Sequence, residues 1–197
     1  MEFESPKQKA VRVESIRTEV ELIREKMMSI SLDGIETHMM IEAVMQACEA
    51  ALEGNYGIGA VLMANGQVAA RGHNQIADPS NPWVHVAHAE LTTLAHYHAS
   101  LPPDLWDHRS LTMFSTLEPC PMCTFGMLNA RIPRVKFGAI DEPAGLMFSH
   151  PSKMPPLWRT LLDREGIVHE LALVPEEVRK ACRDIFLLTR NFKHEDI

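Results

Sequence analysis

A length of 197 residues with 46% hydrophobic content is sufficient for one domain with a sizeable core. The N-terminus "MEFESPKQKA" lacks the apolar stretch of a signal peptide and no apolar run is long enough for a membrane span, so we expect a soluble cytoplasmic protein with no membrane partner. The formal net charge of -7 argues against a broadly basic nucleic-acid surface, although a local patch such as Arg131, Arg134 and Lys136 stays open.

The N-terminal segment predicts an amphipathic helix. Its apolar residues recur at steps of three and four and form one seam: Val13, Ile16, Val20, Ile23, Met27 and Ile30. The sequence "SLDG" then ends the pattern. We therefore assign residues 1–35 to an N-terminal helical extension and residues 36–197 to the main domain. The seam either packs on its own domain or forms a subunit contact.

The rest of the chain alternates between helical and extended patterns. Asn65-Gly66 is a favoured pair for a tight hairpin, and it separates two predicted strands. Further strands are expected in "SLTMFSTL", "RVKFGAI" and "IVHELALV". Helices are expected over 36–52, in "HAELTTLAHYHA", from Pro121 to about Ala130 and after Pro175. The proline-rich residues 141–157 indicate an irregular loop. The fold class is α/β, with three layers, α/β/α, around a mixed sheet of about five strands.

Two cysteines stand three positions apart in "STLEPCPMC", where a buried strand leads into a helix. Cys120 and Cys123 share one face of the first helical turn, a spacing that suits either a redox dithiol or a metal site. Upstream, "HVAHAEL" supplies His88 and Glu90 as another helix begins, and at a helix start both can face a ligand beyond its end. Two such helix starts at one edge of a sheet indicate a catalytic crevice.

These segments resemble a known family. His88-Ala89-Glu90 followed by Pro119-Cys120-Pro121-Met122-Cys123 matches the H-x-E and P-C-x-x-C motifs of the cytidine-deaminase-like zinc deaminases. "TLEPCPMC", "ARIPRVKFGA" and "GAVL…GHN" are similar to the branch that holds cytosine and guanine deaminases and tRNA adenosine deaminases. The resemblance covers about residues 36–190 and implies that residues 36–197 form a zinc-dependent deaminase domain.

The resemblance implies a role for each motif residue. His88, Cys120 and Cys123 would hold one Zn2+ per chain, Glu90 would move protons, and Asn74 and Ala89 would contact the substrate. The chemistry suits these residue types, because zinc with three protein ligands lowers the pKa of water toward about 7. A carboxylate that accepts a proton and then donates it completes a hydrolytic deamination. His85 is the alternative histidine ligand, but His88 has the family's offset to Glu90.

The loop after residue 140 offers further candidates for substrate binding. Phe148 could stack on a ring, and Asp141 and Glu142 could bind exocyclic amines. Phe192, Glu195 and Asp196 of the tail could close the site, although fraying is the simpler interpretation.

We expect an enzyme that deaminates a small nucleobase or nucleoside, guanine- or cytosine-type, as a homodimer. Nucleic acid is an unlikely partner but not an excluded one. The alternatives are a tRNA adenosine-to-inosine deaminase, which needs a local basic groove, and a zinc-stabilised scaffold without activity.

Overall fold

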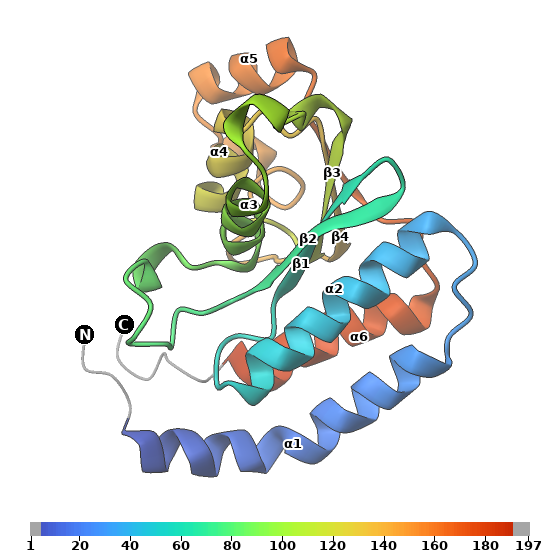
Figure 1. Ribbon diagram of the computed structural model, residues 1–197, viewed down its shortest axis with the longest axis vertical. Helices are drawn as coiled ribbons and strands as arrows, with labels where there is room; N and C mark the ends of the chain where they lie inside the picture. Colours follow the sequence, from blue (N-terminus) through green and yellow to red (C-terminus); the bar gives the residue numbers. More distant parts are fainter. Residues whose placement is uncertain (1–4, 191–197) are drawn as a thin grey trace.

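The computed structural model describes residues 5–190, which are organised around one five-stranded sheet with the strand order β2-β1-β3-β4-β5 (Figure 1). The strands are β1 Gly59–Ala64, β2 Gln67–His73, β3 Leu111–Leu117, β4 Arg134–Ala139 and β5 Val168–Leu171. The helices are α1 Pro6–Ser29, α2 Ile35–Leu52, α3 Ala89–Ser100, α4 Pro121–Asn129, α5 Pro156–Glu165 and α6 Glu176–Thr189.

The two halves of the sheet differ in direction. Strand β1 pairs antiparallel with β2 and with β3, whereas β3, β4 and β5 are parallel. The β1–β2 turn has Asn65 at φ 51° and Gly66 at φ 76°, the positive angles that a two-residue hairpin of the I′ type needs. Helix α4 joins the parallel neighbours β3 and β4, as a crossover connection requires.

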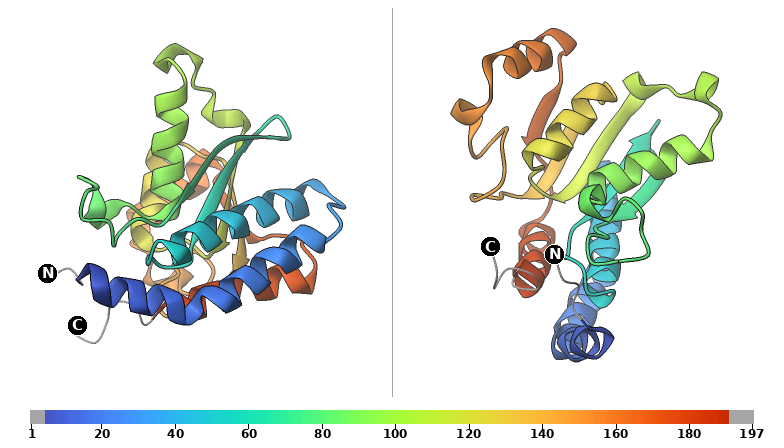
Figure 2. Two further views of the ribbon diagram at one scale, coloured as in Figure 1. Left: turned by 60° about the horizontal axis from the view of Figure 1, so that its bottom comes forward. Right: turned by 90° about the vertical axis from the view of Figure 1, so that its left-hand side faces the viewer.

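Helices cover both faces of the sheet (Figure 2). Successive side chains of each strand point to opposite faces and so contribute to two cores. One core joins α1, α2 and α6 to the sheet and includes Val61 and Phe114. The other lies under α3 and α4 and includes Leu62 and Met113. Strand β3 is central and buried along its whole length. The predicted three-layer α/β/α class with a mixed sheet of about five strands is confirmed.

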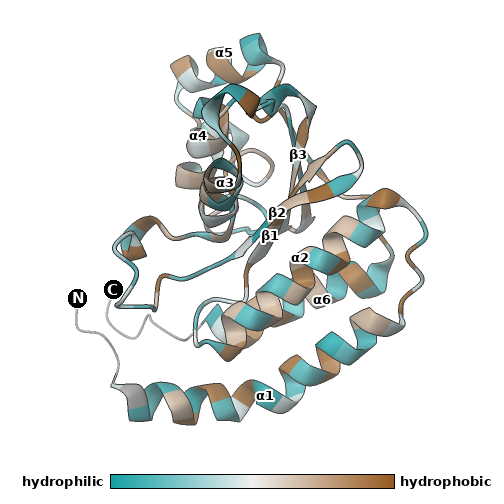
Figure 3. Cartoon of the chain, in the orientation of Figure 1, coloured by the Kyte–Doolittle hydropathy of each residue, from teal (hydrophilic) through white to brown (hydrophobic). Residues whose placement is uncertain are grey.

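Helix α1 lies outside this sandwich, with polar and apolar residues alternating along it (Figure 3). Four residues of its predicted seam, Val13, Ile16, Val20 and Met27, are buried within this chain. The seam therefore packs on its own domain, in the core that also holds α2 and α6 residues.

The expected loop over residues 141–157 is only partly correct, because α5 begins at Pro156 and continues to Glu165. The high proline content indicates a loop, but a proline in the first turn is compatible with a helix. Gly166 ends α5 in the left-handed region at φ 65°. None of the helices within residues 5–190 is both long and apolar enough to cross a membrane.

Candidate active site

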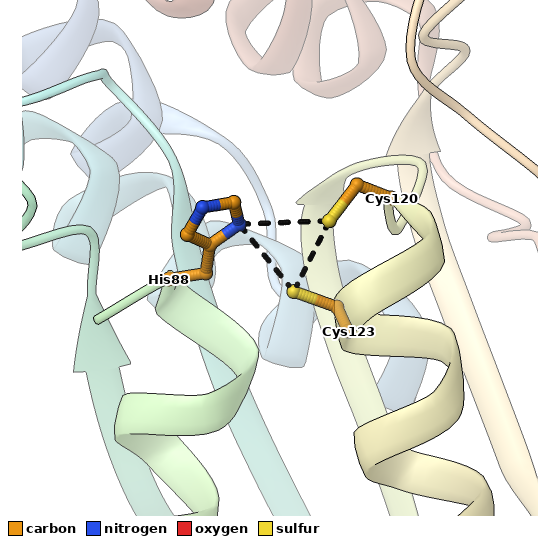
Figure 4. A group of neighbouring side chains, drawn as sticks. All are labelled: His88, Cys120 and Cys123. Carbon is orange, nitrogen blue, oxygen red and sulfur yellow. Dashed lines mark hydrogen bonds between the residues drawn. The ribbon is translucent and has the colours of Figure 1, made fainter. Parts of the chain in front are cut away.

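Helices α3 and α4 begin next to each other, and their first residues form the site (Figure 4). His88 and Cys120 occupy the N-cap positions of α3 and α4, with extended backbone, and Cys123 lies in the first turn of α4. Backbone N–H groups at helix starts have no partner within the helix and therefore favour thiolate charge nearby. The two motifs thus bring three potential metal-ligand atoms, one nitrogen and two sulfurs, close together.

The cluster has the dimensions of a zinc site. His88 Nδ1 lies 3.6 Å from each sulfur, and the two sulfurs lie 3.7 Å apart. Tetrahedral zinc, with bonds of about 2.3 Å to sulfur and about 2.05 Å to nitrogen, separates two sulfurs by about 3.8 Å and a sulfur from a nitrogen by about 3.6 Å. Among residues 5–190, this is the group of three histidine, cysteine or acidic side chains close enough to share one metal ion.

The two thiols behave as a coupled pair. The hydrogen bond from Cys123 and the neighbouring His88 ring lower the pKa of Cys120 to about 4, although burial opposes this. The hydrogen bond to Cys120 and burial raise the pKa of Cys123. A thiolate therefore forms more readily on Cys120 than on Cys123, and metal binding requires both thiols to lose their protons. Burial opposes protonation of His88, but Cys120 and Glu90 together raise its pKa.

Glu90 lies in the first turn of α3, 4% exposed, and its Oε1 accepts a hydrogen bond from Ser115 Oγ of β3 at 3.2 Å. Burial raises the pKa of Glu90, so its carboxyl can hold a proton more readily than an exposed glutamate. A buried carboxyl group held by the Ser115 hydroxyl beside a metal cluster is suited to proton transfer.

A cavity of about 250 Å³ opens over the cluster and is lined by His88, Glu90, Cys120 and Cys123. This volume lies just below the usual range for small-molecule pockets and suits a single base. Asn74 and Ala89 also line it. Asn74 Oδ1 accepts from Ile76 N at 3.3 Å, whereas the buried Nδ2 has no hydrogen-bond partner within the described chain. The Asn74 amide therefore offers a donor to a bound molecule, and so does the N–H of Ala89 at the start of α3.

The loop that follows β4 is fixed by Glu118, which is 2% exposed. Its Oε1 accepts from the backbone N of Phe148 at 2.9 Å and of Ser149 at 2.8 Å, and its Oε2 also bonds the Ser149 hydroxyl. Asp141, at the start of this loop, is buried and lines the cavity, and burial raises its pKa.

Two predicted substrate residues lie elsewhere. Phe148 is 49% exposed, packs edge-on against Phe137 and does not line the cavity, because Glu118 holds its backbone. Glu142 lines a neighbouring cavity instead. His85 is exposed, so the structure brings His88 and not His85 to the cysteines.

Other residues of the cavity lining were not predicted from the sequence, among them Tyr56, Phe186 and Arg190. The rings of Tyr56 and Phe186 meet edge-on at 6.5 Å. The four-residue step from Phe186 to Arg190 on the last predicted helix was the available signal, since it places both on one face. The suggested closing residues of the tail, Phe192, Glu195 and Asp196, lie outside residues 5–190.

The sequence is similar to a family of zinc-binding deaminases. Residues 35–139 match the family model of the cytidine and deoxycytidylate deaminase zinc-binding region. The tRNA-specific adenosine deaminase of Bacillus subtilis (strain 168) is 37% identical over 143 residues, which cover 73% of this chain and 81% of that protein.

Solved structures of deaminases are also similar to this chain. One from a study of A-to-I editing by tRNA:A34 deaminases has a TM-score of 0.59 at 26% identity and covers 76% of this chain and 99% of that chain. A chain crystallised in complex with 8-azaguanine also has a TM-score of 0.59, with coverage of 79% and 86%, but its 19% identity shows the fold alone.

These findings confirm the family resemblance and the zinc cofactor. They contradict the prediction of a small nucleobase or nucleoside as partner with nucleic acid unlikely, because similar proteins are named tRNA adenosine deaminases. The prediction was wrong because it used net charge, a sum over the whole surface, to judge a contact that depends on local charge. The homodimer and the cytoplasmic location stay predictions.

Proposed function

The chain belongs to the family of the cytidine and deoxycytidylate deaminase zinc-binding region, and on that premise we propose that it hydrolyses adenosine to inosine in tRNA, with release of ammonia. The observation that carries this proposal is the long match to the Bacillus subtilis tRNA-specific adenosine deaminase. A match of 143 residues in a chain of 197 must include every site residue from Asn74 to Asp141.

The donor set supports zinc as the metal. His88, Cys120 and Cys123 would hold it, and two thiolates with one neutral imidazole compensate the charge of a divalent cation. When bound, zinc with three protein ligands lowers the pKa of water toward about 7 and so makes hydrolysis feasible at neutral pH.

Glu90 would serve as the general acid and base. Deamination adds water at the ring carbon that carries the amino group, protonates the adjacent ring nitrogen and then protonates the departing amine. One carboxyl group can carry both protons in turn: it takes the first from water and gives it to the ring nitrogen, then takes the second from the hydroxyl group of the adduct and gives it to the departing amine. The hydrogen bond from Ser115 keeps Glu90 oriented toward the cavity, and burial keeps bulk water from competing for the proton.

Asn74 and Ala89 would orient the base. The unpartnered Nδ2 of Asn74 is buried at the cavity wall, where a substrate acceptor would recover the lost hydrogen bond. The Ala89 N–H stands beside the catalytic carboxyl group at the start of α3. We propose in addition that residues 1–35 are an extension to a deaminase domain of residues 36–197, because α1 packs outside the three layers.

A substrate panel tests the proposal. Zinc-loaded protein is incubated with a tRNA carrying adenosine at the wobble position and, separately, with free adenine, guanine, cytosine and their nucleosides. Inosine is measured by mass spectrometry after nuclease digestion, and ammonia by a coupled assay. We expect inosine in the tRNA and little ammonia from the small molecules.

The matched controls are the same tRNA with guanosine at that position and the Glu90→Gln variant, both of which should give no inosine. Efficient ammonia release from a free base or nucleoside, without inosine in tRNA, would overturn the proposal. Zinc-loaded protein that is inactive on every substrate would favour a scaffold.

A further inference from the structure

Two histidines meet where α3 ends. His98 lies in the last turn of α3, and His108 lies in the connection from α3 to β3, residues 101–110 (Figure 1). Their Nε2 atoms are 2.9 Å apart. Neither side chain lines the catalytic cavity. His98 follows the zinc ligand His88 by ten positions, which is about 15 Å along the helix axis, so an ion bound here is distinct from the catalytic zinc.

Aromatic packing holds both histidine rings in place. The Trp106 ring lies 4.3 Å from the His98 ring and 6.0 Å from the His108 ring, measured between centroids. The ring of Tyr97, a buried residue, lies 5.7 Å and 6.2 Å from the same two rings. The indole N–H of Trp106 donates to Leu101 O at 3.1 Å, which fixes the tryptophan. The pair is therefore preorganised, and a ligand that needs both nitrogens costs little side-chain entropy.

The separation of the two nitrogens fits one metal ion with a right angle between its bonds. With metal–nitrogen bonds of about 2.05 Å, a right angle places the nitrogens about 2.9 Å apart, whereas a tetrahedral angle places them about 3.3 Å apart. Right angles are characteristic of tetragonal Cu(II) and Ni(II) sites, which accept imidazole ligands. Without a metal, the same separation fits a hydrogen bond in which one Nε2–H donates to the other Nε2. A proton and a metal ion therefore compete for this pair.

Both rings can present a neutral nitrogen to a metal. Burial and the nearby His108 lower the pKa of His98, so His98 is uncharged at pH 7. The ring that donates the hydrogen bond has only to move its proton from Nε2 to Nδ1 to free its lone pair. The last carbonyl groups of α3 also favour a cation, and the connection carries Asp104 and Asp107 against one arginine, Arg109.

We propose that His98 and His108 bind one divalent transition metal ion, Cu(II) or Ni(II), through their Nε2 atoms, with water at the remaining positions. The ion joins the end of α3 to the segment that leads into β3. Because the unfolded chain does not hold the two rings together, metal binding stabilises the folded protein. The site is independent of the proposed function, since it contains no catalytic residue.

Calorimetric titration of untagged, zinc-loaded protein with Ni(II) tests the site. Ni(II) is the probe because, unlike Cu(II), it does not oxidise thiols. We expect about one Ni(II) per chain with a micromolar Kd, and a Tm that rises by roughly 5–10 °C when Ni(II) exceeds this Kd about a hundredfold. His98→Gln and His108→Gln should each raise the Kd at least about tenfold and abolish the rise in Tm, because one imidazole cannot chelate the ion. His96→Gln, exposed on the same helix, is the matched control and should change neither quantity.

Nuclear magnetic resonance of the wild-type protein identifies the ligands without any substitution. Substoichiometric Ni(II), which is paramagnetic in such a site, should broaden the imidazole signals of His98 and His108 before those of the other histidines. Broadening led by other histidines, or wild-type Kd values in both glutamine variants, would overturn the site and leave the pair as a hydrogen bond only. No deaminase assay enters either measurement, so failure of the proposed function leaves the outcome for this site unchanged.

Discussion

The catalytic floor and the rim of the cavity are built in different ways. The floor consists of His88, Glu90, Cys120 and Cys123, which lie at the starts of α3 and α4. The rim consists of Asp141, Pro143 and Ala144 in the loop after β4, with Phe186 of α6 and Arg190 just after α6, and most of these side chains are half-exposed or exposed. We infer that the floor sets the chemistry and kcat, whereas the rim sets binding and KM.

The largest expected effect comes from breaking the floor. Cys123→Ala removes one metal ligand and should reduce zinc content from about one per chain to near zero, with loss of deaminase activity. Zinc is measured by atomic emission and unfolding by calorimetry. The matched control is Cys48→Ala, a buried free cysteine in the other core, which should cost stability but retain zinc. A Cys123→Ala variant with full zinc and activity would contradict the assigned site.

The second effect tests the connection between floor and rim. Glu118→Ala leaves the partly buried N–H groups of Phe148 and Ser149 without their acceptor, so we expect a loss of about 2 kcal/mol in the free energy of unfolding. Hydrogen exchange at residues 148 and 149 should accelerate relative to Glu142→Ala, whose side chain is exposed. Unchanged exchange at these amides would show that the loop keeps its place without Glu118.

A pH effect tests a buried histidine on the edge strand β5, outside both floor and rim. Burial lowers the pKa of His169 on β5 to about 4, and both ring nitrogens lack a hydrogen-bond partner among the described residues. The unfolded chain binds this proton near pH 6.5 and the folded chain only near pH 4, so the unfolded state gains protons first as pH falls. Stability is therefore fully present above about pH 6.5 and decreases toward pH 4, by up to about 3 kcal/mol.

His169→Phe should remove that part of the pH dependence. The free energy of unfolding of both proteins is measured between pH 7 and pH 4. The difference between the two curves cancels the contribution of the carboxyl groups, because both proteins contain them. Parallel curves for wild type and variant would show that His169 is already solvated in the folded protein.

The smallest expected effect concerns Asn74, which lines the catalytic cavity. Asn74→Ala removes the buried donor at the cavity and should raise KM for tRNA about tenfold, with a smaller change in kcat and retained zinc. Asn81→Ala, on the same loop but outside the cavity lining, is the control. A change confined to kcat would show that Asn74 contributes to the chemical step, as the floor residues do, and not to substrate binding.

The floor could be predicted from the sequence because its parts are local. Cys120 and Cys123 share one helical turn, His88 and Glu90 share another, and the pattern of strands and helices brings the two turns to one edge of the sheet. The Asn65-Gly66 hairpin was equally readable, since its positive φ angles depend on those two residues alone.

The rim could not be predicted in the same way. Phe148 is turned from the cavity by Glu118, thirty residues earlier, and Arg190 reaches the cavity only because α6 packs beside β4. Helix α5 was missed because Pro155 and Pro156 were read as loop residues, although a first-turn proline permits a helix. Contacts between distant segments decide each of these outcomes.

The most direct test of the division between floor and rim is the kcat of zinc-loaded Glu90→Gln at saturating tRNA. The substitution retains the size of the side chain and touches no metal ligand, so zinc content, fold and RNA affinity should match wild type. Positioned acid and base groups contribute about 10²–10⁴-fold, and a group used in several transfers belongs in the upper part of that range. We predict that kcat falls by at least about 10³-fold with Kd for RNA unchanged, and a kcat within about tenfold of wild type would contradict the account.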